Sequence, residues 1–380
     1  KPPTHFADLD PAERKALAEE IGLPGYRAKQ IATHFFVHYN DDADSWSDIP
    51  KDIREMVKEK FTPTLITMVR SVNADGGRTR KDLWRLHDGV LVESVLMRYS
   101  DRTTVCISSQ AGCGMSCPFC ATGQGGLKRN LTAGEIVAQV LHARAALTSD
   151  GKSGLRNLVL MGMGEPLLNY EPVVGAMRLM LDDHAYGLSR RRVTLSTSGV
   201  VPMMDRLAQD LPVALAVSLH APNDRLRDEL VPINKKYPLK DLMDACLRYL
   251  PHAPRDFLTF EYCMLDGVND QDIHAKELIA LLKTMPAKLN LIPFNPFPES
   301  GLKRSPAQRV NTFASILLDA GMVATVRKTR GDDIAAACGQ LAGDVVDRTR
   351  VRERDVHKAE IEIAEVSTNE QAVEWLKKLN

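Results

Sequence analysis

The sequence predicts an α/β fold in which a βα barrel, complete or open, follows a small N-terminal helical domain. From about residue 91, short runs rich in β-branched residues alternate with longer amphipathic stretches. This alternation is typical of parallel strands joined by crossover helices. Six such βα units follow one another, whereas residues 1–62 show only helical patterns. In βα barrels the chemistry takes place at the carboxyl ends of the strands.

The N-terminal residues predict a helical hairpin. The stretch PAERKALAEEIG is a helical pattern, and Pro24-Gly25 ends it and begins the next helix, LPGYRAKQIATHFF. Arg27 and Lys29 follow this turn, so the start of the second helix could bind a phosphate through its amide N–H groups. An ordinary hairpin packed on the core is an equally good interpretation.

The barrel region divides into expected strands and helices. Strands are expected at 91–99, 103–109, 157–162, 192–198, 213–220, 257–265, 289–295 and 323–328. The helices expected between them include 132–147, 239–250, 272–285 and 307–320. The predicted parts are a helical domain (1–62), a linker with a β extension (63–100), a barrel core with a C-terminal loop (101–343) and a peripheral charged tail (344–380). The tail ends in a short helix pattern capped by Ser367 and Glu370.

Composition narrows the class of protein. The chain has 380 residues, of which 44% are hydrophobic and 26% charged, as in ordinary globular proteins. It contains no apolar run of the roughly 18 residues that a membrane helix needs, and its first residues lack a signal-peptide pattern. A cytoplasmic protein without a membrane partner is therefore expected. The formal net charge is zero, so any anionic partner must be bound by local clusters of basic residues.

Three of the seven cysteines form a compact motif. Cys113, Cys117 and Cys120 have the spacing C-x3-C-x2-C and come directly after the strand expected at 103–109. A structural zinc site needs four ligands, usually in two separate pairs. Three thiolates can instead bind a [4Fe–4S] cluster and leave one iron open to another ligand. A zinc site completed by Cys106 and a set of three structural cysteines remain as alternatives.

Several motifs together resemble one family. They are CGMSCPFCATG (113–123), GMGEPL (162–167), LSTSG (195–199), SLHA (218–221), PFN (293–295) and RGDDIAAACGQL (330–341). They are similar to those of the RlmN/Cfr family of radical S-adenosylmethionine (SAM) RNA methyltransferases, over about residues 20–342. The resemblance is closer to the branch that methylates carbon 2 of adenine than to the branch that methylates carbon 8. It implies a partial, open barrel of radical SAM type and an RNA-binding role for residues 1–62.

The resemblance also implies the cofactor site. Cys113, Cys117 and Cys120 would bind the [4Fe–4S] cluster, and the amino and carboxylate groups of SAM would take the open iron. The residues implied in SAM binding are Gly164, Glu165, Ser196, Ser218, Leu219, His220 and Asn295. Any one of them alone is weak evidence, because polar residues are common near strand ends. Since they follow several separate strands, a shared pocket is the better explanation.

A radical route is required because carbon 2 of adenine is electron-poor and has no nucleophilic lone pair. In the scheme that the resemblance implies, Cys338 takes a methyl group from one SAM. A second SAM, cleaved to a 5′-deoxyadenosyl radical, then removes hydrogen from the methylated cysteine, and the resulting carbon radical adds to the adenine. Cys106 would attack the sulfur of Cys338 and release the product through a disulfide. Glu93 would remove the proton from carbon 2.

The alternatives for these cysteines and for Glu93 are structural. Taken without the resemblance, Cys106 is a buried strand cysteine and Glu93 an acid at a strand edge. Cys246 and Cys263 have apolar neighbours and are expected in the core.

The partners implied are 23S rRNA, tRNA and an electron donor such as flavodoxin or ferredoxin, with the chain acting as a monomer. Basic residues near predicted strand ends are the candidate phosphate contacts: Arg78, Arg80, Lys81, Lys128, Arg129, Arg190, Arg191, Arg192, Lys235, Lys236, Arg327, Lys328 and Arg330. A solvated surface is the alternative for each run. Two other functions remain open: a different radical SAM enzyme, including one acting on carbon 8, and a non-enzymatic iron–sulfur or zinc RNA-binding protein.

Overall fold

A computed structural model describes residues 2–149, 154–297, 300–327, 331, 334–336 and 339–341. Residues 1–342 form one compact unit and residues 343–380 a second. The capped helix predicted at the C-terminus lies outside the described residues, as does Cys338. The helical domain, β extension and barrel core predicted from the sequence all belong to the first unit, and their division into domains stays a prediction.

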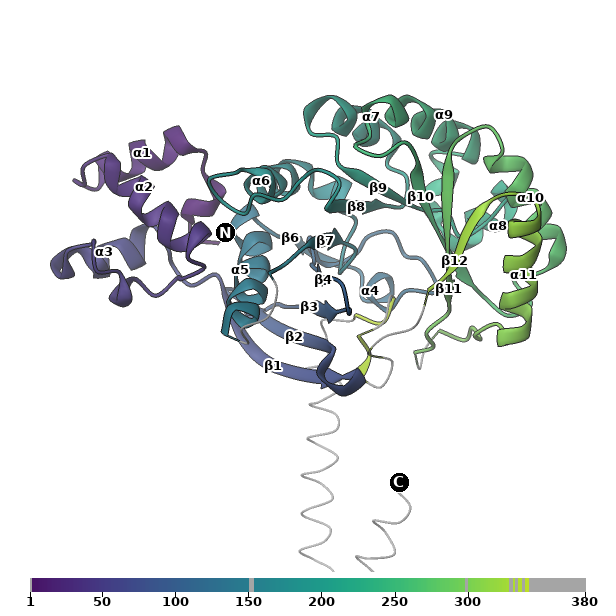
Figure 1. The fold of residues 1–380 in the computed structure, drawn as a ribbon, viewed down its shortest axis with the longest axis horizontal. Coiled ribbons are helices and arrows are strands. Elements are labelled where there is room, and N and C mark those ends of the chain that lie inside the picture. Colours follow the sequence, from purple (N-terminus) through teal and green to yellow (C-terminus); the bar gives the residue numbers. More distant parts are fainter. Residues whose placement is uncertain are drawn as a thin grey trace, which may run out of the picture. The chain divides into compact units, whose positions relative to one another are not determined.

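A ten-stranded sheet organises the first unit (Figure 1). Its strands are β1 (Ile66–Ala74), β2 (Thr79–Leu86), β3 (Leu91–Arg98), β4 (Thr103–Cys106), β7 (Asn157–Leu160), β8 (Val193–Thr197), β9 (Ala214–Ser218), β10 (Leu258–Met264), β11 (Ala287–Pro293) and β12 (Val323–Val326), in that order. The first four are antiparallel, and β4 to β12 are parallel. A separate hairpin pairs β5 (Gln110–Gly112) with β6 (Leu127–Asn130).

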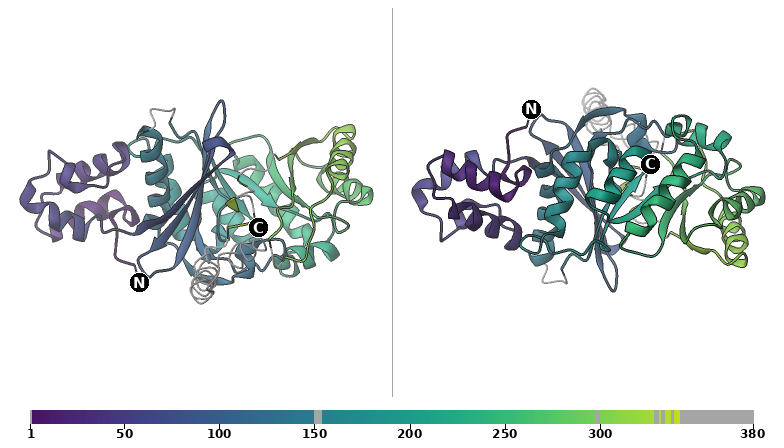
Figure 2. Two further views of the ribbon diagram at one scale, coloured as in Figure 1. Left: turned by 90° about the horizontal axis from the view of Figure 1, so that it is seen from below. Right: turned by 90° about the horizontal axis from the view of Figure 1, so that it is seen from above.

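Helices connect the parallel strands and lie on their outer side (Figures 1 and 2). They are α5 (Ala133–Ser149), α6 (Tyr170–Leu181), α7 (Val201–Asp210), α8 (Asp224–Leu230), α9 (Leu239–Tyr249), α10 (Asp272–Leu282) and α11 (Ala307–Asp319), with the single turn α4 (Ala121–Gln124) after the cysteines. The N-terminal part contributes α1 (Pro11–Glu20), α2 (Tyr26–Ala32) and α3 (Lys51–Lys60). The predicted α/β fold is confirmed. Among the described helices none could cross a membrane.

The sequence of each layer explains its place. Nearly every residue of β10 is buried, as expected for a parallel strand with both faces covered. On α9, the buried residues Leu239, Leu242, Met243 and Cys246 follow a helical period and form one apolar face. The remaining residues of this helix are mostly charged, so the apolar face is the one that packs against the rest of the protein.

The predicted strands do not include β1 and β2. Most residues of β1 are exposed because it is the edge strand of the sheet, and Met68 and Val69 face solvent there. An exposed edge strand lacks the alternation of buried and exposed residues by which strands are predicted from sequence. β2 is mostly buried, but its sequence TRKDLWRL contains four charged residues and therefore lacks an apolar strand pattern.

The N-terminal helices pack around their own aromatic core. Phe6 contacts Phe35, Phe36 and Phe61, with ring centroids 5.1–6.4 Å apart. The guanidinium of Arg14 lies 4.8 Å from the centroid of the Phe6 ring. These contacts favour the structural interpretation of the hairpin.

Asp8 links this N-terminal part to the barrel. Its Oδ1 accepts a hydrogen bond from the Gly134 amide at 2.6 Å, in the first turn of α5, and its Oδ2 accepts one from the His5 amide. An acceptor at a helix N-terminus satisfies an amide that the helix itself leaves unpaired. Asp8 therefore caps α5 from a distant part of the chain.

Replacing Asp8 by alanine should lower the free energy of unfolding by about 1–2 kcal/mol, because the capping bond to α5 is lost. Asp8→Asn keeps an oxygen acceptor and should lose less than half of that. Urea unfolding of both variants measures the difference. Equal stability of Asp8→Ala and the unsubstituted protein would show that the cap contributes nothing.

Candidate active site

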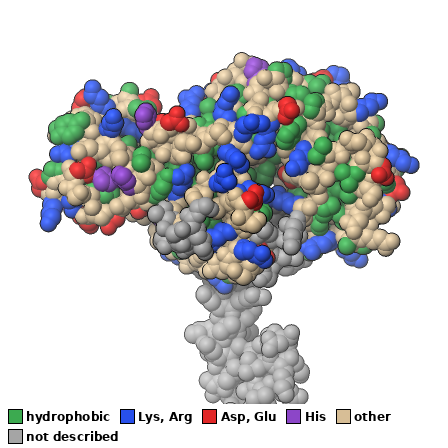
Figure 3. Space-filling model, viewed as in Figure 1, with side chains coloured by type: hydrophobic (Ala, Val, Ile, Leu, Met, Phe, Trp, Pro, Cys, Tyr) green, Lys and Arg blue, Asp and Glu red, His purple; other side chains and the backbone are tan. Residues whose placement is uncertain are grey.

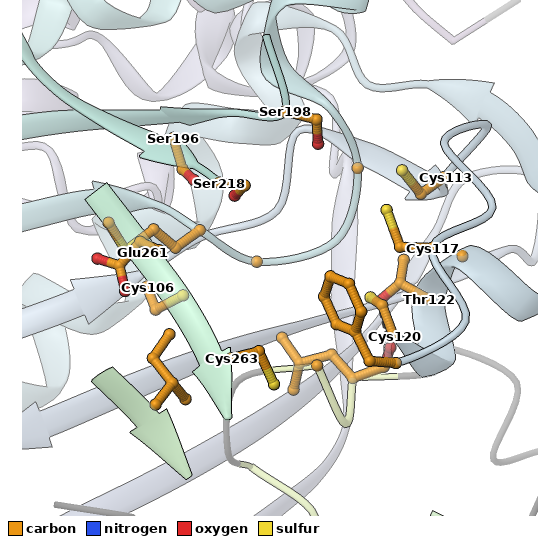
Figure 4. Close-up of a pocket in the computed structure, with 18 of the residues that line it drawn as sticks. Cys106, Cys113, Cys117, Cys120, Thr122, Ser196, Ser198, Ser218, Glu261 and Cys263 are labelled. Carbon is orange, nitrogen blue, oxygen red and sulfur yellow. Dashed lines mark hydrogen bonds between the residues drawn. The ribbon is translucent and has the colours of Figure 1, made fainter. Parts of the chain in front are cut away.

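A cavity of about 200 Å³ lies at the carboxyl ends of the parallel strands (Figure 4). Ten of the residues predicted for the site line it together: Cys106, Cys113, Cys117, Cys120, Gly164, Glu165, Ser196, Ser218, His220 and Asn295. In Figure 4 the three cysteines of the motif lie on one side, and Ser196, Ser218 and Cys106 on the other. The placement matches the expectation of one pocket built from several strands, while the role of each residue stays a prediction.

Two predicted site residues lie elsewhere. The side chain of Leu219 is fully buried in the hydrophobic core and does not line the cavity. Its carbonyl group, rather than its side chain, takes part in holding the site. Glu93 is buried on β3 outside the cavity lining, with its Oε1 2.9 Å from Nζ of Lys81. Glu93 is thus half of a buried ion pair rather than an acid at a strand edge.

The cysteine loop is folded tightly. Gly112, just before Cys113, has φ of +78°, and a Cβ there would lie 1.9 Å from the carbonyl oxygen of Gly126. No side chain fits at this position, since the Cys113 amide donates to the same carbonyl at 3.0 Å. After the cysteines, the Ala121 amide donates to the carbonyl of Gly339 at 2.7 Å. The cysteine loop is therefore in direct contact with the residue that follows Cys338.

The three cysteines fit an iron–sulfur cluster better than a single ion. Among the described residues, no three Cys, His, Asp or Glu side chains are placed to hold one metal ion. A [4Fe–4S] cluster binds each cysteine through a different iron, so its ligands stand farther apart than those of zinc. The zinc site completed by Cys106 therefore finds no support.

Burial disfavours the thiolate form of two of the three motif cysteines. It raises the pKa of Cys113 to about 12 and that of Cys117 well above its usual value. Iron binds thiolates, so cluster assembly must displace these protons. Without a metal centre, Cys113 and Cys117 are therefore poor nucleophiles.

Glu165 joins two loops at the cavity wall. Its Oε2 accepts from the Ser198 amide at 2.7 Å and its Oε1 from the Leu167 amide at 3.1 Å. Burial raises its pKa, although these hydrogen bonds oppose the shift. The side chains of Thr197 and Ser198 also hydrogen-bond to this carboxylate, so it is surrounded by donors at the edge of the cavity.

Gly164, next to Glu165, has φ of +102° and no room for a side chain. A Cβ there would lie 2.5 Å from Cβ of Gln110. The space is needed by Gln110, whose Oε1 accepts from the Glu165 amide.

His220 is held as a neutral ring. Its Nδ1 accepts a hydrogen bond from the Cys263 amide at 3.0 Å, which leaves the proton on Nε2. Burial, with a smaller contribution from Arg227, lowers its pKa to about 3. The ring packs edge-on against Phe119 at 4.6 Å, so it forms a rigid, uncharged part of the wall.

Arg227 on α8 fixes the ends of two strands from behind the cavity. It is fully buried, and its guanidinium donates to the carbonyls of Ser198 (2.7 Å), Ser218 (3.1 Å) and Leu219 (3.1 Å). A fourth bond reaches Oδ1 of Asn234 at 2.9 Å. The segments that carry the expected SAM contacts are thus bound to one side chain.

The basic residues divide into groups with different surroundings. Arg80 is ion-paired with Asp82, and Lys81 with Glu93. Arg129 is ion-paired with both Asp88 and Glu135. Arg190, Arg191 and Arg192 precede β8, at the end of the strand opposite to the cavity. Only Arg327 lines the cavity among the described candidates, and Lys328 and Arg330 lie outside the described residues. The expected phosphate contacts are therefore not one surface.

Contributors to the site that were not foreseen include Ser198, Phe119, Arg227 and Glu261. Ser198, Phe119 and Glu261 line the cavity, as does Cys263, which was expected in the core, and Arg227 supports it. A signal existed for Glu261, because a single acid within the apolar run FLTFEYCML is expected to be buried. For Arg227, one of several charges in NDRLRDEL, the sequence offers no such signal.

Replacing Arg227 by methionine should lower the free energy of unfolding by about 3 kcal/mol or more, because several buried oxygens lose their hydrogen bonds. Arg225→Met, in the same helix at an exposed position, is the matched control and should change it by less than about 0.5 kcal/mol. Urea unfolding of the cluster-free protein measures both. A loss below about 1 kcal/mol for Arg227→Met would contradict this role of the guanidinium.

Comparison with known proteins identifies this arrangement. Residues 107–279 match the Radical SAM superfamily. The crystal structure of a radical SAM methyltransferase from Sphaerobacter thermophilus is 47% identical, with a TM-score of 0.87 over 90% of this chain and 100% of that chain.

Two other solved structures are much less similar. A domain of pyruvate-formate lyase-activating enzyme from Bacteroides vulgatus is 16% identical, with a TM-score of 0.36 over 45% of this chain and 99% of that one. Streptococcus suis SuiB, bound to precursor peptide SuiA, is 10% identical, with a TM-score of 0.44 over 59% and 49%. These two similarities are too low to carry an argument. From the first structure and the superfamily match, the chain belongs to the radical SAM superfamily, among its methyltransferases.

Proposed function

We propose that this protein methylates carbon 2 of an adenosine in RNA, with 23S rRNA and tRNA as substrates, through a methyl group carried on Cys338. The observation that carries the proposal is the shared cavity of Cys106 and the three motif cysteines, whose loop is bonded to Gly339. A radical SAM enzyme that uses no methylated cysteine has less need of two further cysteines beside its cluster.

The residues of the cavity divide the binding tasks. Cys113, Cys117 and Cys120 would hold the [4Fe–4S] cluster, and Glu165 lies where it can accept from the ammonium group of SAM. When bound, the cluster and SAM supply the radical chemistry that an unreactive carbon requires. The neutral ring of His220 and the ring of Phe119, in contact at 4.6 Å, form one wall of the cavity.

The remaining steps belong to the two cysteines and Glu93. Cys338 carries the methyl group to the adenine and becomes covalently joined to the adenine. Cys106 then attacks the sulfur of Cys338 and releases the product. Glu93 takes the carbon-2 proton. The Nζ of Lys81 bonds both to Glu93 and to the carbonyl of Ala335 at 3.2 Å, which supports placing this acid beside the loop of Cys338.

RNA must present its adenine unstacked, because the cavity is enclosed by strand ends. Arg327 at the cavity is the best candidate for contact with the nucleotide. Lysine and arginine side chains are also grouped over the middle of the face in Figure 3, which suits a polyanion despite the zero net charge. An electron donor such as flavodoxin or ferredoxin would complete the turnover.

The proposal predicts 2-methyladenosine as product. The protein, reconstituted anaerobically with iron and sulfide, is incubated with SAM, a reductant and unmodified RNA, and the nucleosides are analysed by mass spectrometry. Serine substitution of Cys113, Cys117 or Cys120 should abolish both iron binding and product. Formation of 8-methyladenosine would assign the other branch of the family, and 5′-deoxyadenosine without a methylated nucleoside would refute RNA methylation under these conditions.

Substitution of Cys106 and substitution of Cys338 should stop the reaction at different steps. Cys106→Ala should leave protein covalently joined to RNA, because nothing releases the Cys338 sulfur, whereas Cys338→Ala should never form the adduct. Denaturing gel electrophoresis with labelled RNA separates the two results. Cys246→Ala, at a buried position away from the cavity, is the control and should leave no adduct. Release of free methylated RNA by Cys106→Ala would contradict this division.

A further inference from the structure

A row of polar side chains crosses the parallel strands at the cavity. Ser218 on β9, Glu261 on β10, Asn290 on β11 and Thr325 on β12 are register partners in turn. Neighbours in register point to the same face of a sheet. Thr325 donates to Oδ1 of Asn290 at 2.8 Å, and Nδ2 of Asn290 donates to Oε1 of Glu261 at 2.9 Å. This chain of hydrogen bonds fixes one oxygen of the Glu261 carboxylate.

The other oxygen of Glu261 is left unsatisfied. Oε2 is buried and has no hydrogen-bond partner among the residues that the structure describes, and the Glu261 side chain is only 5% exposed. Nη1 of Arg327 is 3.8 Å away, too far for a hydrogen bond. A buried carboxylate oxygen without a donor is costly, so its presence at a cavity requires an explanation.

Glu261 and Arg327 both line the cavity and offer opposite hydrogen-bonding groups side by side. A carboxylate only accepts hydrogen bonds, and a guanidinium only donates them. An edge of adenine presents the reverse pattern, with the 6-amino donor beside a ring-nitrogen acceptor. Figure 4 shows Glu261 on the side of the cavity away from the motif cysteines, next to Cys106.

We propose that Glu261 and Arg327 together bind the edge of an adenine, the carboxylate accepting from the 6-amino group and the guanidinium donating to a ring nitrogen. The inference rests on the proposed function, which brings two adenines to this cavity: that of SAM and that of the RNA. The chemistry is the same for both sources. A purely structural role for Glu261 is less economical, because an uncharged side chain would fill the site without burying an unsatisfied oxygen.

The test compares adenosine with purine riboside, which lacks only the 6-amino group. Equilibrium dialysis of the labelled nucleosides against the cluster-reconstituted protein should show about 10- to 100-fold tighter binding of adenosine, the range expected for a hydrogen bond to a charged group. Preference that disappears when SAM is present at saturation assigns the pair to the adenine of SAM. Preference that persists with SAM bound assigns it to the adenine of the substrate RNA.

Substitutions test the two residues. Glu261→Gln keeps an oxygen for Asn290 but presents an amide donor at the place of Oε2, so it should remove the preference for adenosine. Arg327→Gln should weaken adenosine binding about 10-fold or more. Glu277→Gln on α10, whose carboxylate accepts from Asn223, does not line the cavity and should leave the preference unchanged.

The melting temperature of Glu261→Gln shows whether this variant is folded in the binding assay, since the substitution also removes the ion pair with Arg327 at 3.8 Å. Equal binding of the two nucleosides by the unsubstituted protein, or no binding of either, would overturn the proposal, as would an unchanged preference in a folded Glu261→Gln. None of these measurements depends on methylation. A protein that discriminates the nucleosides but forms no methylated RNA would retain the adenine site and lose the proposed function.

Discussion

The cavity depends on one buried guanidinium. Parallel strands end with carbonyl groups that no neighbouring strand pairs, and after β8 and β9 such groups face the fully buried guanidinium of Arg227. Arg227 satisfies the carbonyls of Ser198, Ser218 and Leu219 at once, so the loops after both strands have a single fixed arrangement. Glu165 adds a bond to Ser198 from the other side. These contacts fix the segments that carry Ser196, Ser198, Ser218 and His220 at the cavity.

The same guanidinium has an electrostatic role. Burial lowers the pKa of Arg227 to about 10, which leaves it charged at neutral pH. Its charge favours the thiolate of Cys117, although burial and the other two cysteines raise the pKa of that thiol more strongly. Arg227 therefore offsets part of the cost of forming the Cys117 thiolate that an iron would bind.

The sequence predicted the parts of the site that carry a local signal. The spacing of Cys113, Cys117 and Cys120 is contained in eight residues, and the strand ends that bear Ser196 and Ser218 follow recognisable β-branched runs. Contacts between distant segments have no such signal. The ion pair of Lys81 with Glu93 forms across two antiparallel strands, and the bonds of Arg227 join a helix to two strands. The basic run that contains Lys81 therefore gave no sign that this lysine is buried in an ion pair.

The buried carboxylates of this cavity lower the stability of the fold, and ligand binding explains their presence. An apolar lining would stabilise the fold more, yet the walls contain Glu165 and Glu261, and only Glu165 has both oxygens bonded to described residues. Folding alone does not explain a carboxylate held on one side by Asn290 and left unsatisfied on the other. A ligand that brings donors to such an oxygen recovers the lost hydrogen bond and adds it to its binding free energy. The stability that a buried carboxylate costs therefore becomes selectivity for a ligand with donors in the right place, as proposed above for adenine.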